Sequence, residues 1–403
     1  MSANRINQKI EYRKATPEER LYVTRLQSIA FSNHSENEQE IRDQIAKGEY
    51  GSDEVYGAID ENGRALAGME VIPYVMWFDG HKTDMYGIGG VASAPESRRM
   101  GHVRKIFEKA FADIYEKGAV FSHLYPFSHD YYRKFGYEPV GGVKKYNLPL
   151  GPARYLKNNG EACEFIKGDG ARGALIQVYE SYASRHNLMV SRSDERWDEV
   201  FDVPLFGADR LYYWKDADSE IKSWLKFKKN GETMEINDIA WTDCEGMLGI
   251  LQFMGMFDGA AEKMRIKASP EFVPELYWNN LYDIETEYDW MGMNRVVDVK
   301  RALELMKKPE GDGGFIIKVA DDFARWNDNT YKVEYGGGEC GVKIISPGEN
   351  ADLETSQLSF MLMALGAYEF ERIAHKNDVA VNGNLETLKK AFPKKNLLIA
   401  DYF

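Results

Sequence analysis

A short basic stretch carries the clearest chemical meaning in the sequence. It runs from Val91 to Val103 and reads VASAPESRRMGHV, an apolar strand that passes through a turn into the start of a helix. The first N–H groups of a helix lack partners within the helix, and the helix dipole attracts an anion there. Gly101 allows the backbone to approach a diphosphate without an intervening side chain. We therefore predict an anion site in this loop, with positive charge from Arg98, Arg99 and Arg104.

Three glycines lie in the strand just before this loop, in the segment Gly87-Ile88-Gly89-Gly90. Glycines inside a strand weaken it and mark either a bulge or the close approach of another backbone. Two interpretations remain open. A ligand with its own amides, such as a pantetheine arm, could pair with the strand, or a bulge could only shape the sheet.

The third chemical feature is a tyrosine in the segment SHDYYRKFGY, residues 128–137. The ordinary pKa of a tyrosine is about 10 and that of a thiol about 8.5. Tyr132 could therefore donate a proton to a leaving thiolate. Packing in a core is the alternative role for this side chain.

Histidines offer competing candidates for a general base. They are His34, His102, His123 and His129. Their spacing lacks the carboxylate or cysteine partners of a metal site, so we expect no metal. The glycine run Gly336–Gly338 is expected to be a turn between strands, because no helix start follows it.

These residues need a framework of strands and helices to bring them together. Helices are expected at 17–31, 37–47 and 128–135, and strands at 54–60, 65–78, 83–92 and 119–124, with a return strand from Tyr137. Asp79-Gly80 suits a two-residue hairpin. The helix that ends at Gly118 has one apolar face, formed by Val103, Ile106, Phe107, Ala110, Phe111 and Ile114. The pattern is that of an α/β fold.

The rest of the chain repeats this alternation in two more blocks. We predict domains at 1–150, 151–290 and 291–403. The middle block has strands near 210–216, 221–228, 233–241 and 263–267, but its helix start at Thr242–Gly246 contains no basic residue. The last block has a helix at 297–306, strands near 314–320, 330–335 and 341–346, and an apolar helix from about 355.

Composition narrows the class of partner. The 403 residues carry a net charge of -13, which disfavours nucleic acid and favours cationic small molecules, although acidity also serves solubility. Cys163, Cys244 and Cys340 are widely separated, which is typical of a reduced cytoplasmic protein. We find neither a signal peptide nor an apolar stretch of the roughly 20 residues that span a membrane. The last residues, LLIADYF, are unusually apolar for a chain end.

The loop RRMGHV followed by YYRKFGY resembles the pyrophosphate loop and the leaving-group tyrosine of the GNAT acetyltransferase superfamily. The chain as a whole resembles the Eis (enhanced intracellular survival) family of bacterial N-acetyltransferases. That resemblance implies a mixed α/β fold with two tandem GNAT-like domains, the second without a phosphate loop, followed by a sterol-carrier-protein-like domain.

The resemblance also implies roles for residues. Acetyl-CoA is the expected co-substrate, Tyr132 the general acid, and the terminal carboxylate of Phe403 the general base, with Asp401 and Tyr402 at the amine pocket. The expected cofactor-binding residues are Ile88, Gly89, Gly90, Val91, Arg98, Arg99, Met100, Gly101, His102, Val103 and Arg104. The family's carboxylate stands next to the final aromatic residue, whereas here Tyr402 intervenes, so substrate preference does not transfer. A homo-oligomer, a hexamer by resemblance, is expected.

Three functions follow from these observations. The first is acetylation of a primary amine on a cationic small molecule such as an aminoglycoside or a polyamine. The second is acetylation of protein lysines. The third is binding of lipids by a protein whose transferase half is vestigial, and the intact loop at Arg98–Val103 argues against it. The apolar face at Leu358–Leu365 is expected to pack in a core.

Overall fold

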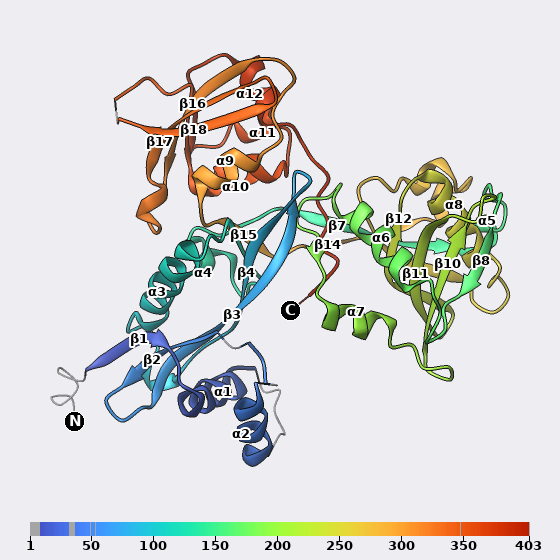
Figure 1. The fold of residues 1–403 in the computed structure, drawn as a ribbon, viewed down its shortest axis with the longest axis horizontal. Helices are drawn as coiled ribbons and strands as arrows, with labels where there is room; N and C mark the ends of the chain where they lie inside the picture. Colours follow the sequence, from blue (N-terminus) through green and yellow to red (C-terminus); the bar gives the residue numbers. More distant parts are fainter. Residues whose placement is uncertain (1–8, 32–36, 49, 53, 347, 403) are drawn as a thin grey trace.

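The computed structural model of the chain describes residues 9–31, 37–48, 50–52, 54–346 and 348–402. The described residues form three mixed β-sheets with helices packed against them (Figure 1). The spatial order of the strands in each sheet shows how segments that are far apart in the sequence come together.

The first sheet is built mainly from the first part of the chain. Its strands, in spatial order, are β1 (Ile10–Lys14), β2 (Val55–Asp60), β3 (Ala65–Phe78), β4 (His81–Ser93), β5 (Phe121–Leu124), β15 (Met293–Val296) and β6 (Glu138–Pro139), and β9 (Val190–Ser191) pairs with β3. The helices of this part are α1 (Pro17–Phe31), α2 (Glu38–Lys47), α3 (His102–Glu116) and α4 (His129–Arg133). The predicted apolar face of α3 is confirmed, because Ile106, Phe107, Ala110, Phe111 and Ile114 are all buried.

The hairpin between β3 and β4 is the predicted two-residue turn. Phe78 pairs with His81 across it, and Asp79 and Gly80 have φ angles of +50° and +83°. Both angles lie in the left-handed region that this type of turn requires. The hairpin places β4 beside β3 along nearly its whole length.

The second sheet repeats the core of the first. Its strands, in spatial order, are β14 (Glu285–Trp290), β7 (Gly142–Pro149), β13 (Lys263–Ala268), β12 (Thr233–Trp241), β11 (Ile221–Asn230), β10 (Asp209–Lys215) and β8 (Glu161–Glu164). Its helices are α5 (Leu150–Ala153), α6 (Arg172–Ala183), α7 (Asp194–Phe201) and α8 (Cys244–Gly255). β12 and β13 are parallel and joined through α8, just as β4 and β5 are parallel and joined through α3. The tandem α/β arrangement is thus confirmed.

The two sheets exchange strands. β7 follows β6 in the sequence but pairs with β13 and β14 of the second sheet. β15 follows the second sheet in the sequence but lies between β5 and β6 of the first. The proposed division at about residues 150 and 290 stays a prediction, because each sheet contains a strand from the other side of a boundary.

The third sheet has the spatial order β18 (Glu339–Ile345), β17 (Asn329–Gly336), β16 (Gly313–Ala320), β19 (Leu353–Ser356) and β20 (Val379–Val381). Around it lie α9 (Val299–Leu305), α10 (Gln357–Leu365), α11 (Phe370–Ile373) and α12 (Leu385–Ala391). Short 3-10 helices occur at Pro95–Ser97, Pro274–Leu276, Leu281–Asp283 and Arg325–Asn327. The glycine run at 336–338 is the expected turn between two strands, and Met361, Leu362 and Leu365 of α10 are buried in the core as expected.

The described residues include no helix that is both long and apolar enough to cross a membrane. Among the same residues, no group of three or more His, Cys, Asp or Glu side chains is placed to hold a metal ion. All three cysteines are free.

Candidate active site

The first sheet opens where β4 and β5 diverge. The two strands are parallel and paired from Met85 with Phe121 to Ile88 with Leu124. β5 ends there, while β4 continues to Ser93 with β3 as its only strand partner in the described part of the chain. The edge of β4 beyond Ile88 is therefore available to another backbone.

A bulge occupies the same stretch of β4. The register between β3 and β4 shifts between Gly68 and Glu70, and Gly90 has a φ of +57°. The Gln27 side-chain amide donates to the Gly90 carbonyl at 3.2 Å, and a Cβ at Gly90 would lie 2.0 Å from that nitrogen. The bulge expected from the glycines is confirmed, and it lies next to the open strand edge.

The basic loop leads from β4 into α3 and leaves the helix start uncapped by a side chain. Gly101 is the N-cap, with a φ of +83° and no atom within 4 Å of a Cβ built there. Arg98, Arg99 and Met100 are exposed. In the second sheet the corresponding helix, α8, is capped instead by the Asp243 carboxylate, which accepts from Gly246 N–H at 2.9 Å. Of these two helix starts, that of α3 has no side-chain cap and lies beside exposed arginines, as an anion site requires.

The other predicted residues of this loop are held by protein contacts. Arg104 forms an ion pair with Glu108 at 3.0 Å, one turn further along α3. His102 is buried, and its Nδ1 lies 3.1 Å from the Tyr12 hydroxyl. Burial, with a smaller effect of Lys105, lowers the pKa of His102. Val103 is half-buried against the core. Contact of a ligand with this loop thus falls to the backbone and to the exposed residues.

Tyr132 lies on α4, which begins after the Ser128 cap, and it faces the open end of β4. The Ser128 hydroxyl accepts from Tyr131 N–H at 3.4 Å. The Tyr132 side chain is only 4% exposed and packs near Phe107 and Phe127, with ring centroids 6.3 Å and 5.5 Å away. Burial raises the pKa of Tyr132 well above its ordinary value of 10, so the hydroxyl keeps its proton at neutral pH.

The predicted cofactor strand and the predicted acid share one small cavity. It has a volume of about 170 Å³ and is lined by Phe31, Ile88, Gly89, Gly90, Val91, Tyr125, Phe127 and Tyr132. The end of α4 is fixed by the fully buried Arg295 of β15, which donates to the Phe135 carbonyl and forms an ion pair with Asp321 at 2.5 Å. The strand inserted between β5 and β6 therefore supports the helix that carries Tyr132.

The end of the described chain reaches this region from the third sheet. The Tyr402 ring stacks on Tyr125, with centroids 4.9 Å apart and an interplanar angle of 28°. Asp401 and Tyr402 line a second cavity of about 700 Å³, to which Tyr74, Asp84 and Glu195 also contribute. Phe403, the residue predicted to supply the base, lies outside the described residues, as does His34.

His123 and His129 differ in environment. His123 is buried on β5, where its Nδ1 lies 3.0 Å from Asn294 Oδ1, and burial lowers its pKa to about 4. A base with that pKa accepts a proton poorly at neutral pH. His129 is exposed at the start of α4.

Sequence reasoning missed the residues that surround Asp401. The Asp401 carboxylate accepts from Arg192 Nε at 3.1 Å and from Arg196 Nε at 3.3 Å. The Tyr179 hydroxyl also donates to it at 3.1 Å. These partners lie some 200 positions earlier, and only the fold relates them to the tail. Tyr125 could have been found, because it directly follows a strand whose carboxyl end faces the opening.

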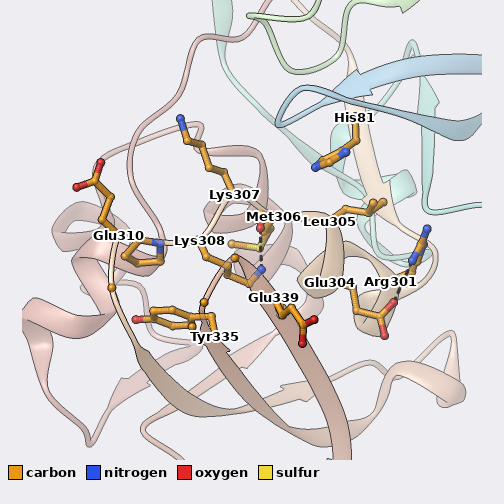
Figure 2. A pocket seen from close by; sticks show the side chains of 16 residues that line it. His81, Arg301, Glu304, Leu305, Met306, Lys307, Lys308, Glu310, Tyr335 and Glu339 are labelled. Atoms are coloured by element: carbon orange, nitrogen blue, oxygen red, sulfur yellow. Dashed lines mark hydrogen bonds and ion pairs between the residues drawn. The ribbon is translucent and has the colours of Figure 1, made fainter.

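A separate cavity of about 660 Å³ lies between His81 of the β3–β4 hairpin and the third sheet (Figure 2). Two of its basic side chains, those of Lys308 and Arg301, are already bound. Lys308 donates to the Met306 carbonyl at 2.7 Å, and Arg301 pairs with Glu304 at 3.2 Å. No predicted site residue lines this cavity, and we do not assign it to the active site.

Comparison with known families defines the class of protein. Residues 11–140 match the acetyltransferase (GNAT) domain, and residues 299–399 match the sterol carrier protein domain. The first match contains the open strand edge, the basic loop and Tyr132. The chain is thus an enzyme, an acetyltransferase of the GNAT type, with a sterol-carrier-like domain at residues 299–399.

Solved structures match almost the whole chain. A probable N-acyltransferase from Enterococcus faecalis has a TM-score of 0.83 and 18% identity, and the match covers 98% of this chain and 100% of that one. A GCN5-related N-acetyltransferase from Anabaena variabilis has a TM-score of 0.81 and 17% identity, with the same coverage. Eis1 from Mycobacterium abscessus has a TM-score of 0.75 and 14% identity, again covering 98% and 100%. These likenesses establish a common fold. A search of curated protein sequences found no match.

Proposed function

We propose that this protein belongs to the Eis family and transfers an acetyl group from acetyl-CoA to a primary amine of a cationic small molecule, such as an aminoglycoside or a polyamine. Tyr132 acts as the general acid and the terminal carboxylate of Phe403 as the general base. The observation that carries this proposal is the shared cavity of Tyr132 and the open edge of β4, with the tail stacked on Tyr125 of the same cavity. The fold shared with Eis1 along the chain supports the family.

The first sheet fits acetyl-CoA by its shape and its polar groups. The free edge of β4 at Ile88–Val91 suits the amides of the pantetheine arm, and the uncapped start of α3 suits the diphosphate. Exposed Arg98 and Arg99 add positive charge. When bound, acetyl-CoA supplies an acetyl thioester that an amine attacks directly, so no enzyme nucleophile is required.

Two proton transfers are needed, one to the leaving thiolate and one from the attacking amine. Burial keeps the Tyr132 hydroxyl protonated, so it can donate to the leaving thiolate. The amine must lose a proton, and a free terminal carboxylate has a pKa of only about 3.5. Burial raises that value and makes the carboxylate a better base. The burial of Leu397, Leu398 and Ile399 in the tail supports such an environment.

The cavity of about 700 Å³ beside the tail is the proposed amine site. Asp84 and Glu195 line it and can attract an ammonium group. Asp401 also lines it, but its carboxylate already carries bonds from two arginines. We therefore assign the attraction of the substrate to the first two carboxylates and to the net charge of -13.

The two alternatives gain no support from a specific contact. Acetylation of protein lysines uses the same chemistry and remains an outcome of the assay. Lipid binding by a vestigial transferase would require an apolar cavity in the third sheet, yet the apolar residues of α10 form core. The intact loop before α3 also favours catalysis.

The proposal includes location and assembly. Three free cysteines agree with a cytoplasmic protein. A homo-oligomer, a hexamer as the family resemblance implies, would cover exposed aromatic residues near β14 at the edge of the second sheet, among them Tyr282, Tyr288 and Trp290. Mass photometry measures this state directly.

A C-terminal extension tests the general base. Two glycines added after Phe403 move the carboxylate away, so we expect loss of amine-dependent thiol release from acetyl-CoA by at least about a hundredfold. The same residues added before Met1 are the control and leave activity intact. The assay uses a panel of aminoglycosides, polyamines and a lysine peptide. Full activity in the C-terminal variant removes the terminal base, and activity toward the peptide alone favours the protein-lysine alternative.

A further inference from the structure

The tail crosses a large part of the molecule before it reaches the active site. Figure 1 shows the red C-terminal segment passing from the third sheet beside β7 and β14 toward the space between the first two sheets. Along this path Asn187 N–H donates to the Asn396 carbonyl at 2.9 Å, and Leu398 N–H donates to the Asn187 carbonyl at 3.2 Å. Leu397, Leu398 and Ile399 are buried. The tail is thus bound to the protein before its last residues.

The next anchor is the carboxylate of Asp401. Arg192 donates to it, and the same guanidinium forms an ion pair with Asp238 at 2.6 Å. The Arg192 side chain is 2% exposed and lies over the Tyr179 ring, 4.1 Å from its centroid. Arg196 adds a second positive charge from α7. Because this carboxylate is buried and its charge is compensated from within, it serves the protein rather than a bound amine.

The last anchor is the hydroxyl of Tyr402. It accepts from Lys267 Nζ at 2.7 Å and donates to Asp289 Oδ2 at 2.6 Å. Its ring meanwhile stacks on Tyr125, which lines the cavity with Tyr132. Tyr402 is therefore held on one side by the second sheet and rests on the first.

The partners of the Asp401 carboxylate and of the Tyr402 hydroxyl come from residues between β7 and β15. Tyr179 belongs to α6, Arg196 to α7, Lys267 to β13 and Asp289 to β14, while Arg192 follows β9. In this part of the chain the start of α8 is capped by Asp243. Other polar groups of the same part converge on two consecutive residues of the tail.

We propose that this middle part of the chain is a clamp that positions the chain end in the active site, with Arg192 and Arg196 holding Asp401 and with Lys267 and Asp289 holding Tyr402. The inference rests on the proposed function, because it assigns the clamp the task of placing the terminal base. Arg192, Arg196, Lys267 and Asp289 are positioning residues that act through the tail.

Asp401→Asn tests the clamp with little change in shape. Loss of the carboxylate charge weakens the bonds to Arg192 and Arg196 and frees the tail. We expect hydrogen exchange of the peptide covering residues 397–402, measured by mass spectrometry, to become at least about tenfold faster. We expect kcat to fall by about tenfold or more and the KM for acetyl-CoA to stay within about twofold. We also expect a shift in the acid limb of the curve of kcat against pH. Asp401→Glu restores the charge and most of both properties.

Two variants accompany it. Tyr402→Phe removes both hydroxyl bonds but keeps the ring on Tyr125, and we expect a smaller change of the same kind. Asp198→Asn is the matched control, since Asp198 lies on α7, is exposed and forms an ion pair with Arg172 at 2.7 Å, away from the tail. It should change neither exchange nor kcat.

The outcomes separate this clamp from the proposed function. Unchanged exchange and unchanged kcat in Asp401→Asn overturn the clamp while amine acetylation stands. A raised KM for the amine alone, with a protected tail, makes Asp401 a substrate-binding residue and also overturns it. If the unaltered protein acetylates no amine, the proposed function fails, while faster exchange in Asp401→Asn still supports the hold on the tail. If the unaltered protein is active, faster exchange with an unchanged kcat overturns the clamp's task.

Discussion

Burial suits the Tyr132 side chain to the proton donation that we propose for it. Its ring lies among Phe107, Phe127 and Tyr131, and this apolar setting disfavours the phenolate. The pKa is raised, so the proton remains on the hydroxyl throughout the range in which an amine can be free to attack. A tyrosine in water would begin to lose its proton near pH 10.

Replacing Tyr132 with phenylalanine removes the hydroxyl and keeps the ring. We expect kcat to fall by about a hundredfold to ten-thousandfold, with the Kd of acetyl-CoA within about twofold, because the loss concerns proton transfer alone. In the unaltered enzyme the raised pKa keeps the acid protonated, so kcat should show no alkaline loss below about pH 10. The decrease of kcat should instead occur at acid pH, where the general base takes up a proton.

Tyr131→Phe is the matched control for this experiment. Tyr131 lies next to Tyr132 on α4, and burial raises its pKa as well. Steady-state kinetics across pH should leave this variant close to the unaltered enzyme. An unchanged kcat in Tyr132→Phe removes that tyrosine from the mechanism.

The starts of α3 and α8 show how one helix position decides what an element can bind. Both helices connect parallel strands in similar sheets. The α3 start has a glycine and exposed arginines, whereas the α8 start has an aspartate bonded to its own helix. A carboxylate at that position satisfies the N–H groups and repels a phosphate.

Gly101→Ala tests the role of the α3 start. Gly101 has a φ of +83°, so alanine costs about 1 kcal/mol of the free energy of unfolding through backbone strain alone. We also expect a Kd for CoA at least about tenfold higher, because the methyl group intrudes where the diphosphate approaches. Urea unfolding and calorimetric titration measure the two effects.

Gly118→Ala is a control at the other end of the same helix. Its φ is +88°, and no atom lies within 4 Å of its Cβ either. It should lose a similar free energy of unfolding while the Kd for CoA stays unchanged. Equal Kd values in both variants contradict a diphosphate site at Gly101.

Local features were the ones that the sequence could predict. The apolar spacing of α3, the Asp79-Gly80 hairpin and the glycine bulge each depend on neighbouring residues, and each is confirmed. β15 escaped prediction because its four residues, MNRV, include buried Asn294 and Arg295. Polar residues in a short segment give no strand pattern.

The residues around the tail could not be predicted for a different reason. Arg192 and Asp401 stand 209 positions apart, and no local rule relates them. Sequence reasoning placed Asp401 at the amine pocket, and this stays a prediction; in the structure Asp401 lines the cavity of about 700 Å³ that we propose as the amine site. That its charge is taken up by arginines follows only from the folded arrangement.

At the scale of the whole molecule, a buried ion pair joins the three sheets. Asp79 of the β3–β4 hairpin accepts from Lys395 Nζ at 2.6 Å and from Lys307 N–H at 2.8 Å. Asn187 donates to the same carboxylate at 3.2 Å. The side chains of Lys395 and Asp79 are 11% and 5% exposed. Burial, opposed by Asp79, lowers the pKa of Lys395.

Lys395→Met should therefore be costly. It leaves the Asp79 carboxylate buried without its cation, and we expect the free energy of unfolding to fall by about 3 kcal/mol. The adjacent Lys394 pairs with Glu369 at 3.2 Å and is 58% exposed, so Lys394→Met should change stability by less than about 1 kcal/mol. Urea unfolding followed by tryptophan fluorescence compares them. Equal stabilities would show that the pair contributes nothing to the junction.

The exchange of strands has a consequence for biosynthesis. Because β15 lies between β5 and β6, the acetyltransferase sheet lacks an internal strand until residues 293–296 have been made. Until then, the open edges of β5 and β6 and the apolar face of the neighbouring helix must not associate with other chains. A gene fragment that stops near codon 150 would encode Tyr132 and the entire loop at Arg98–Val103 yet yield an insoluble product, since the missing strand lies far downstream.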